Sequence, residues 1–255
     1  MDRKPDSESR MVPPATLEER IANTLIPAPL YWRIRAYRGL LKGEAELRLL
    51  RYLADPAKTS VDAGANKGVY TYFLSRYSRH VYAYEPNPKI FALLARSVKG
   101  RNVTARPSAL SDVTGEAMLV VPRRKAGYSN QLASLRPDKF TGEAMRIPVA
   151  TRRLDDEDVG DPGFVKIDVE GFETNVLEGA RATLARSRPT LLVEIEEVHT
   201  GRPVEDTLGA VQAMGYRGLF LDHGRLVTLA RFDPVKNHRA GDPATYVFNF
   251  IFLPA

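Results

Sequence analysis

The sequence predicts an α/β fold: a doubly wound, mostly parallel sheet with a helical extension before it. From residue 57 onward, short apolar segments alternate with amphipathic ones, which is typical of strand–helix–strand crossover units. A glycine-containing turn joins the first expected strand directly to the first expected helix. The chain has 255 residues, 44% of them hydrophobic, so it can bury one large core.

The residues before the sheet fall into two parts. Residues 1–20 are polar, proline-bearing and aperiodic, so they are predicted to be a flexible leader. Residues 21–56 are predicted to be a helical extension in two pieces, with Pro27 and Pro29 interrupting the first. Residues 31–38 mix aromatic and basic side chains. We expect a helix with its aromatic face on the core and its arginines outward; membrane-surface docking or a substrate lid are the alternatives.

Each element of the sheet region has a local signal. Short apolar runs predict strands, helical spacing of apolar residues predicts helices, and Gly100 ends one helix. Residues 111–156 interrupt the alternation and carry two extra strands. The expected strands are 59–63, 81–84, 102–108, 117–121, 145–149, 164–168, 191–195 and 246–253, and the expected helices are 69–78, 89–98, 173–186 and 204–214.

The composition excludes several kinds of chemistry. There is no cysteine, which excludes disulfides, thiol catalysis, iron–sulfur clusters and cysteine-ligated zinc. The four histidines are scattered, without an HExxH motif. No apolar run approaches the ~18 residues of a membrane span, and the first residues are too polar for a signal peptide. We therefore expect a soluble, cytoplasmic protein, with peripheral membrane contact as a less favoured alternative.

The net charge of +6 is concentrated in one segment. Residues 122–153 hold eight basic and two acidic residues, so this segment accounts for the whole excess (8 − 2 = +6). Such a segment can steer an anionic ligand, but a solvated loop without a partner is the favoured interpretation. Aromatic residues are not regularly interleaved with the charges, so no nucleic-acid partner is expected.

The most informative motif is the turn from strand to helix at residues 61–68, VDAGANKG. Glycines in such a turn let backbone N–H groups approach a ligand closely. The Walker pattern GxxxxGK[ST] is absent, and the spacing does not match the dinucleotide pattern GxGxxG. Asp62, Gly64, Asn66 and Gly68 instead match acid-x-G-x-(G/N)-x-G, the motif of class I S-adenosylmethionine-dependent methyltransferases.

A second signal follows the next strand. Glu85 closes the segment YAYEP, where a carboxylate can accept hydrogen bonds from both hydroxyls of a ribose. This geometry is shared by NAD and S-adenosylmethionine sites, and the glycine pattern favours the latter. Ser108 and Ala109, at the end of the third strand, are candidates for contact with the adenine.

From about Gly43 onward the chain resembles the FkbM-type methyltransferase family over roughly 150 residues. The matching segments are VDAGANKGVYTYFLS (61–75), VYAYEPNP (81–88), RRLDD (152–156), FVKIDVEGFETNVLEGA (164–180) and RPTLLVEIEE (188–197). The resemblance implies a Rossmann-like fold with a seven-stranded sheet, residues 57–255 as the methyltransferase domain, and S-adenosyl-L-methionine as methyl donor. It also implies O-methylation of a small molecule such as a sugar, polyketide or lipo-oligosaccharide. His199 departs from the family pattern, because many members place a histidine directly after the strand that ends near Glu194.

Candidate catalytic residues lie in the segment KIDVEGFE (166–173). Alternation along a strand places Lys166, Asp168 and Glu170 on one side, at the carboxyl end of a buried strand where ligands of open α/β sheets bind. Methyl transfer from a sulfonium needs alignment of the acceptor and removal of its proton. Asp168 is the first candidate for the base and His199 the second.

Other roles for these residues stay open. Asp168 can instead form a structural ion pair with Lys166, or hold a divalent cation together with Glu170 or Glu194. Glu173 is interpreted as favourable placement at a helix N-terminus. The inserted basic stretch, which contains residues 128–131 (YSNQ), is expected to recognise the substrate, and the amide and hydroxyl side chains of YSNQ suit a polyol. For the chain as a whole, the alternatives are an NAD-dependent oxidoreductase and a non-catalytic binding protein of the same fold.

Overall fold

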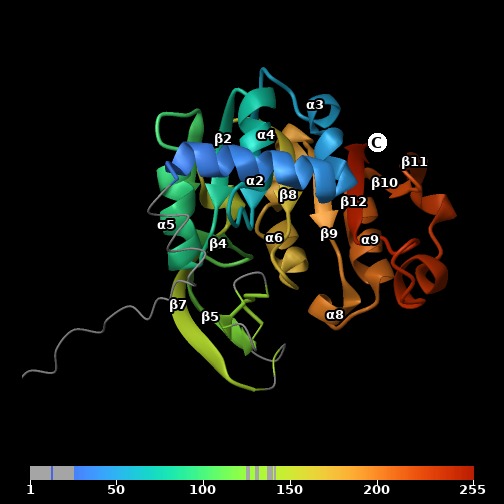
Figure 1. Cartoon of the computed structure of the whole chain (residues 1–255). Coiled ribbons are helices and arrows are strands. Elements are labelled where there is room, and N and C mark those ends of the chain that lie inside the picture. The colour runs from blue at the N-terminus through green and yellow to red at the C-terminus, as the bar shows by residue number, and fades with distance from the viewer. Residues whose placement is uncertain (1–12, 14–25, 125–126, 130–131, 137–139, 141) are drawn as a thin grey trace, which may run out of the picture.

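The computed structural model describes Pro13 and residues 26–124, 127–129, 132–136, 140 and 142–255 (Figure 1). The predicted leader, residues 1–20, lies outside the described residues apart from Pro13. The main sheet has the order β11-β10-β12-β9-β8-β1-β2-β3. Its strands are β1 (Thr59–Ala63), β2 (His80–Tyr84), β3 (Val103–Arg106), β8 (Pro162–Ile167), β9 (Thr190–Glu194), β10 (Tyr216–Asp222), β11 (Arg225–Thr228) and β12 (Asn249–Pro254).

The predicted doubly wound, mostly parallel sheet is confirmed, with one strand more than the expected seven. Strands β3, β2, β1, β8 and β9 pair in parallel, and β12 runs antiparallel between β9 and β10. The eighth strand, β11, is joined to β10 by the two-residue turn His223-Gly224. Both turn residues have positive φ (48° and 75°), as a tight hairpin turn requires. This hairpin extends the sheet at its edge, away from the glycine turn.

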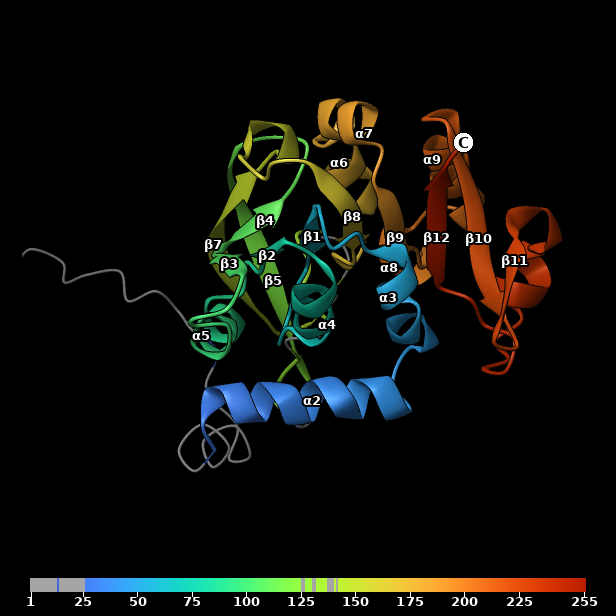
Figure 2. The ribbon, with the colours of Figure 1, turned by 90° about the horizontal axis from the view of Figure 1, so that it is seen from above.

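Helices cover both faces of the main sheet (Figure 2). One face carries α2 (Ala28–Lys42), α3 (Leu50–Leu53), α4 (Val69–Tyr77) and α5 (Pro88–Ser97); the other carries α6 (Glu173–Glu178), α7 (Arg181–Ser187) and α9 (Val204–Ala213). Alternation along the strands supplies both cores: Phe164 of β8 packs under α2 and α4, whereas Val165 and Ile167 pack with α6 and α7. The switch between faces falls at β1 and β8, where the glycine turn lies.

Of the helical extension, the structure describes residues 26–56. Helix α2 begins at Ala28 with Pro29 in its first turn, where a missing N–H costs nothing. Residues 21–25, the part of the first expected helical piece before Pro27, lie outside the described residues. Trp32 is buried, and its Nε1–H donates to the carbonyl oxygen of Gly68 at 2.6 Å. The aromatic face is only partly on the core, because Tyr37 is exposed like Arg33 and Arg38, and Arg35 is half-buried rather than outward. The extension thus contacts the glycine turn directly.

A second sheet is inserted between β3 and β8. It has the order β4-β7-β5-β6, formed by β4 (Ser108–Leu110), β5 (Gly115–Arg124), β6 (Gly127–Tyr128) and β7 (Ala144–Arg152). The two predicted extra strands are confirmed and are longer than expected. The expected strand 102–108 is wrong at its end, because β3 stops at Arg106 and, beyond Pro107, Ser108 joins the second sheet. In Figure 1 this sheet extends beyond the carboxyl ends of the parallel strands.

Two other boundaries differ from the prediction. The expected helix 173–186 is divided into α6 and α7 at Gly179 and Ala180. Gly179 lies so close to the chain at Ser111 that a Cβ there would be 1.9 Å from the Ser111 carbonyl oxygen. The expected strand 246–253 starts only at Asn249, since Tyr246 stacks on His238 instead. Among the described residues, the helices are too short or too polar to cross a membrane.

Candidate active site

The glycine turn is held tightly against the ends of β2 and β8. Gly64 has φ +77°, and its N–H donates to the carbonyl oxygen of Tyr84 at 3.1 Å. A Cβ at Gly64 would be 1.8 Å from the carbonyl oxygen of Asp168. Gly68 has φ +78°, and a Cβ there would be 2.8 Å from Trp32 Nε1. Only glycine fits either position, so at Gly64 and Gly68 no side chain covers the backbone of the turn between β1 and α4.

Glu85 faces the same turn from the end of β2. Its two carboxylate oxygens accept the backbone N–H groups of Asn66 and Asn87, each at 2.8 Å. Asn66 itself has φ +49°, which points this N–H toward the carboxylate. The side chain is buried, and this burial raises the pKa of Glu85 to about 7. Glu85 therefore ties the glycine turn to the β2–α5 connection.

We expect the pKa of Glu85 to make stability depend on pH. The folded chain binds this proton more tightly than the unfolded chain, whose pKa is about 4.5, so the free energy of unfolding falls as pH rises from about 4.5 to about 7. Glu85→Gln should reduce this fall in the free energy of unfolding by about 2–3 kcal/mol. Part of the fall should remain, because burial also raises the pKa of Glu173 to about 7.

Urea unfolding at a series of pH values between 4.5 and 8 measures this difference. Glu116→Gln, at an exposed position of β5, is the matched control and should follow the wild-type profile. Parallel pH profiles for wild type and Glu85→Gln would contradict the assignment.

The other predicted cofactor residues have different surroundings. Asp62 is fully buried and accepts a hydrogen bond from Thr71 Oγ1 at 2.6 Å, so it joins β1 to α4 below the turn. Its Oδ1 has no hydrogen-bond partner among the residues that the structure describes. Ala109 contributes to the wall of the cavity described next, whereas Ser108 is buried in β4 beside it.

A cavity of about 340 Å³ opens beside the glycine turn. Its wall includes seven of the residues singled out in the sequence: Gly64, Asn66, Glu85, Ala109, Asp168, Glu170 and Glu194. A neighbouring cavity of about 280 Å³ shares Gly64, Asn66 and Asp168 with it and reaches Lys166, Tyr70 and Ser129. Asp168 thus lies where the two cavities meet. Of the segment 128–131, Asn130 and Gln131 lie outside the described residues.

Asp168 forms an ion pair with Lys166, whose Nζ is 2.7 Å from Asp168 Oδ2. Lys166 is buried, and its Nζ lies 4.6 Å from the centre of the Tyr70 ring. Burial alone would lower the pKa of Lys166, but the carboxylates of Asp168, Asp62 and Glu44 outweigh it and raise this pKa. The ion pair that the sequence left as an alternative is therefore present, and Asp168 nevertheless remains in the cavity wall.

Glu170 and His199 are brought together although 29 positions separate them in the sequence (199 − 170). Glu170 Oε2 is 3.1 Å from His199 Nδ1. Glu170 has φ +58°, an uncommon conformation for a residue other than glycine. Gly171 next to it has φ +101°, and a Cβ there would be 2.3 Å from the His199 carbonyl oxygen. His199 is not among the residues that line the cavity, but it contacts Glu170, which is.

The second sheet and its loops hold this arrangement in place. Ser134 Oγ donates to the carbonyl oxygen of Glu170 at 2.6 Å, and Arg136 donates to those of His199, at 3.1 Å, and Thr200. His199 and Thr200 belong to the short helix α8 (Glu197–Thr200). Arg136, one of the eight basic residues in the segment 122–153, is therefore engaged with the protein itself.

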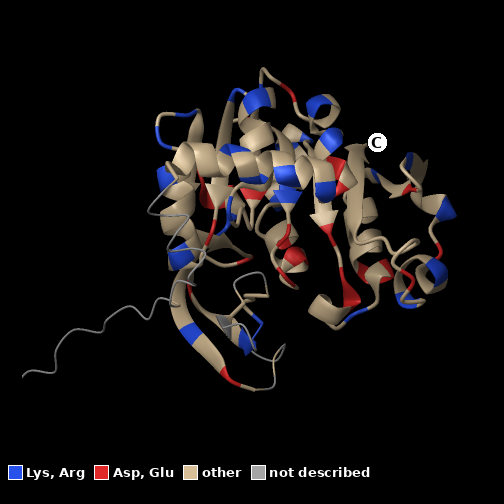
Figure 3. Cartoon of the chain, in the orientation of Figure 1, with Lys and Arg blue, Asp and Glu red and all other residues tan. Residues whose placement is uncertain are grey.

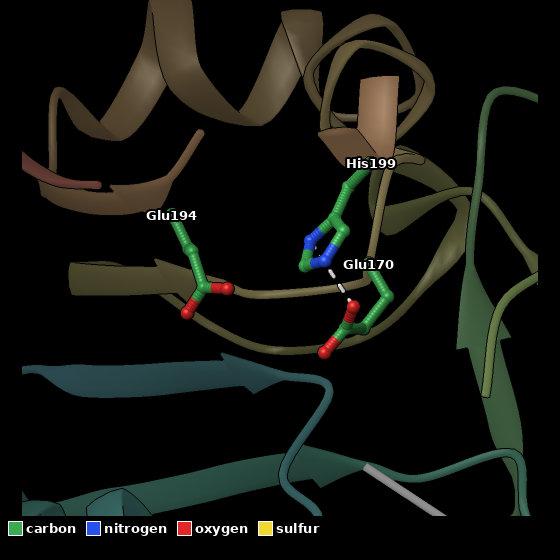
Figure 4. A group of neighbouring side chains, drawn as sticks. All are labelled: Glu170, Glu194 and His199. Atoms are coloured by element: carbon green, nitrogen blue, oxygen red, sulfur yellow. Dashed lines mark ion pairs between the residues drawn. The ribbon is translucent and has the colours of Figure 1, made fainter. Parts of the chain in front are cut away.

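Glu194, at the end of β9, completes the acidic group. Burial, followed by the charge of Asp168, raises the pKa of Glu194 to about 10. Glu170, Glu194 and His199 each offer a donor atom, and these three atoms lie within 4.8 Å of one another (Figure 4). Figure 3 shows the acidic residues that gather where β8 and β9 end.

Comparison with known proteins places this site in a family. The model of the methyltransferase FkbM domain matches residues 62–218, which include the glycine turn, Glu85 and the segment around Asp168. The chain belongs to the FkbM methyltransferase family. The resemblance noted in the sequence is thereby confirmed.

Two relatives illustrate how far the likeness of this FkbM methyltransferase extends. It is 26% identical over 181 residues to the hexuronic acid methyltransferase AglP of Haloferax volcanii, covering 69% of each chain. It is 18% identical to the FkbM methyltransferase of Methylobacillus flagellatus, whose crystal structure it matches with a TM-score of 0.52 over 88% of its own length. The chain spans half the length of that protein, and the match shows that the fold is shared.

Several residues of the FkbM methyltransferase site were not singled out from the sequence. Glu44, from the loop after α2, lines both cavities, and Ser134 lines the larger one. Glu173 was interpreted only as favourable charge placement, but its carboxylate accepts the N–H of Gly171 at 2.9 Å and so holds the turn after Glu170. Neither the spacing nor the residue type of Glu44 and Ser134 sets them apart in the sequence.

Proposed function

We propose that this FkbM methyltransferase transfers a methyl group from S-adenosyl-L-methionine to a hydroxyl of a sugar or glycosylated metabolite. The observation that carries the proposal is the cavity bounded on one side by the bare glycine turn and Glu85, and on the other by Asp168 and Glu170. A donor and an acceptor can thus meet at Asp168.

The residues around the glycine turn fit the donor. The cavity beside the turn has a volume of about 340 Å³, which lies within the ~300–1,000 Å³ of small-molecule sites. A side chain at Gly64 would collide with the chain at Asp168, so the turn keeps its backbone open. Gly64 and Asn66 would hold the methionine part, Glu85 the ribose hydroxyls, and Ala109 with Leu110 the adenine. All five of these residues line the cavity.

The reaction requires the protein to align the acceptor hydroxyl with the methyl donor and to take up the proton of that hydroxyl. When bound, S-adenosyl-L-methionine supplies a methyl group on a sulfonium, and its leaving group departs neutral. The chain must orient the acceptor hydroxyl and remove its proton. Asp168 is the proposed base: it lies in the wall of both cavities, and the ion pair with Lys166 fixes its orientation.

The acceptor proposal has two supports. The relative AglP is named as a hexuronic acid methyltransferase. In this chain the acceptor side of the cavity is rich in hydrogen-bonding groups, since Glu44, Ser134, Glu170 and Glu194 line it. Sugars are recognised through polar groups of this kind.

The chain carries its own reporter for the donor. Trp32 is the only tryptophan, and its indole N–H is bonded to Gly68 at the end of the turn. Titration with S-adenosyl-L-methionine, S-adenosylhomocysteine and NAD⁺ should change Trp32 fluorescence with the first two only. Incubation with neutral and hexuronic-acid oligosaccharides, followed by mass spectrometry, should then show the gain of one methyl group. Binding of NAD⁺ without binding of S-adenosyl-L-methionine would refute the proposal.

A further inference from the structure

We propose that Glu170, Glu194 and His199 form a binding site for one divalent cation of the Mg²⁺/Mn²⁺ class, on the acceptor side of the cavity. The proposal that a cation binds is based on the geometry of these residues. The role of the cation in catalysis rests on the proposed function. Two carboxylates and one imidazole are a common set of ligands for such cations, because oxygen donors suit Mg²⁺ and Mn²⁺ and imidazole suits transition metals.

The three donors come from three separate elements, which the backbone fixes in place. Glu170 lies in the turn after β8, Glu194 ends β9, and His199 lies in α8. Their donor atoms are within 4.8 Å of one another, whereas two adjacent ligands of an octahedral cation lie about 3 Å apart. Rotation of these long side chains closes the difference, while the close approach of Gly171 to the His199 carbonyl keeps the two segments together.

The charges around the three residues call for a cation. Glu44, Asp168, Glu170 and Glu194 all line the same cavity. Lys166 is the buried cation nearby, and it is paired with Asp168 at 2.7 Å. Within the described part of the chain, no hydrogen bond or ion pair reaches the carboxylate of Glu194. A divalent ion bound by Glu170 and Glu194 would lie among these carboxylates and offset their negative charge.

Such an ion would act on the acceptor. Three protein ligands leave coordination positions open, and these can accept one or two hydroxyls of a sugar. The ion would polarise the hydroxyl, so that its proton passes more readily to Asp168 as the new O–C bond forms and the S–C bond breaks. A neighbouring pair of hydroxyls would then be the preferred acceptor.

Manganese binding tests the site without any activity assay. The full-length protein, freed of metal with EDTA and dialysed, is titrated with Mn²⁺ while the electron paramagnetic resonance of free Mn²⁺ is followed. We expect one Mn²⁺ per chain, with affinity at least about tenfold weaker in Glu194→Gln and in His199→Gln. Glu116→Gln in β5 and His223→Gln in the β10–β11 turn are exposed matched controls and should bind as wild type does.

A second measurement does not depend on any variant. Pulsed electron paramagnetic resonance of the wild-type protein with Mn²⁺ should show coupling to a ¹⁴N nucleus, the signature of a coordinating imidazole. Absence of stoichiometric binding, absence of this coupling, or unchanged affinity in folded Glu194→Gln and His199→Gln would each overturn the site.

The two proposals fail separately. Trp32 fluorescence measures S-adenosyl-L-methionine binding in the presence of EDTA. If the donor binds and methyl transfer runs equally fast in EDTA, the catalytic role of the cation is wrong and the proposed function stands. If Mn²⁺ binds at these residues but the donor does not bind, the proposed function is wrong and the metal site stands.

Discussion

Replacement of Asp168 by asparagine is expected to slow methyl transfer by a factor of about 10²–10⁴, the usual contribution of a positioned base. Asparagine has the same shape, and its carbonyl can still accept a hydrogen bond from Lys166, but it cannot take up a proton. The affinity for S-adenosyl-L-methionine, measured by Trp32 fluorescence, should change only a few-fold. The rate is measured as transfer of a labelled methyl group to the acceptor.

The substitution also removes the ion-pair partner of a buried lysine, so its effect on stability must be measured alongside. Loss of one member of a buried pair can cost about 3–5 kcal/mol; here the charges of Asp62 and Glu44 near Lys166 reduce that cost. Asp158→Asn, at an exposed position, is the matched control. Unchanged turnover in a folded Asp168→Asn protein would remove Asp168 as the base.

Replacement of Gly64 by alanine is expected to destabilise the chain by about 2–5 kcal/mol and to weaken donor binding at least about tenfold. The new Cβ would be 1.8 Å from the carbonyl oxygen of Asp168, and φ of +77° is unfavourable for alanine. The collision involves backbone on both sides, so β1 and β8 must move apart at the edge of the cavity. Urea unfolding and fluorescence titration measure the two effects.

Gly209 offers a control of the same chemistry. It lies in α9, and a Cβ there would meet no atom within 4 Å. Gly209→Ala should leave donor binding unchanged and stabilise the chain by up to about 1 kcal/mol, because alanine favours a helix. Equal free energies of unfolding and equal donor affinities in Gly64→Ala and Gly209→Ala would show that the glycine turn does not approach β8 as described.

The main sheet could be predicted from the sequence because its signals are local. The strand 59–63, the glycine turn and the helix after it follow one another within about twenty residues, and the structure has the strand and helix within one residue of the predicted bounds. The position of the site could also be predicted in part, because ligands of open α/β sheets bind at the carboxyl ends of the parallel strands. Asp168, Glu170 and Glu194 were expected there, and all three line the cavity.

The remaining features depend on contacts between distant segments. His199 reaches Glu170 only because Gly171 allows the backbone to approach α8, and the sequence carries no sign of that contact. The sequence gives no sign of a particular partner for Arg136, which donates to the carbonyl oxygens of His199 and Thr200. Strands β10 and β11 are absent from the expected elements. The four residues of β11 lie mostly exposed at the sheet edge and show no clear alternation.

The second sheet is formed by a single insertion in the chain, between β3 and β8, and it has a small apolar core of its own. It supplies Ser134 and Leu135 to the acceptor side of the cavity, whereas Gly64 and Glu85 come from the main sheet. Grafting residues 115–152 from another member of the family would therefore exchange the acceptor preference as a module. The residues proposed to hold the methyl donor, including Ala109 and Leu110 of β4, would remain those of this chain.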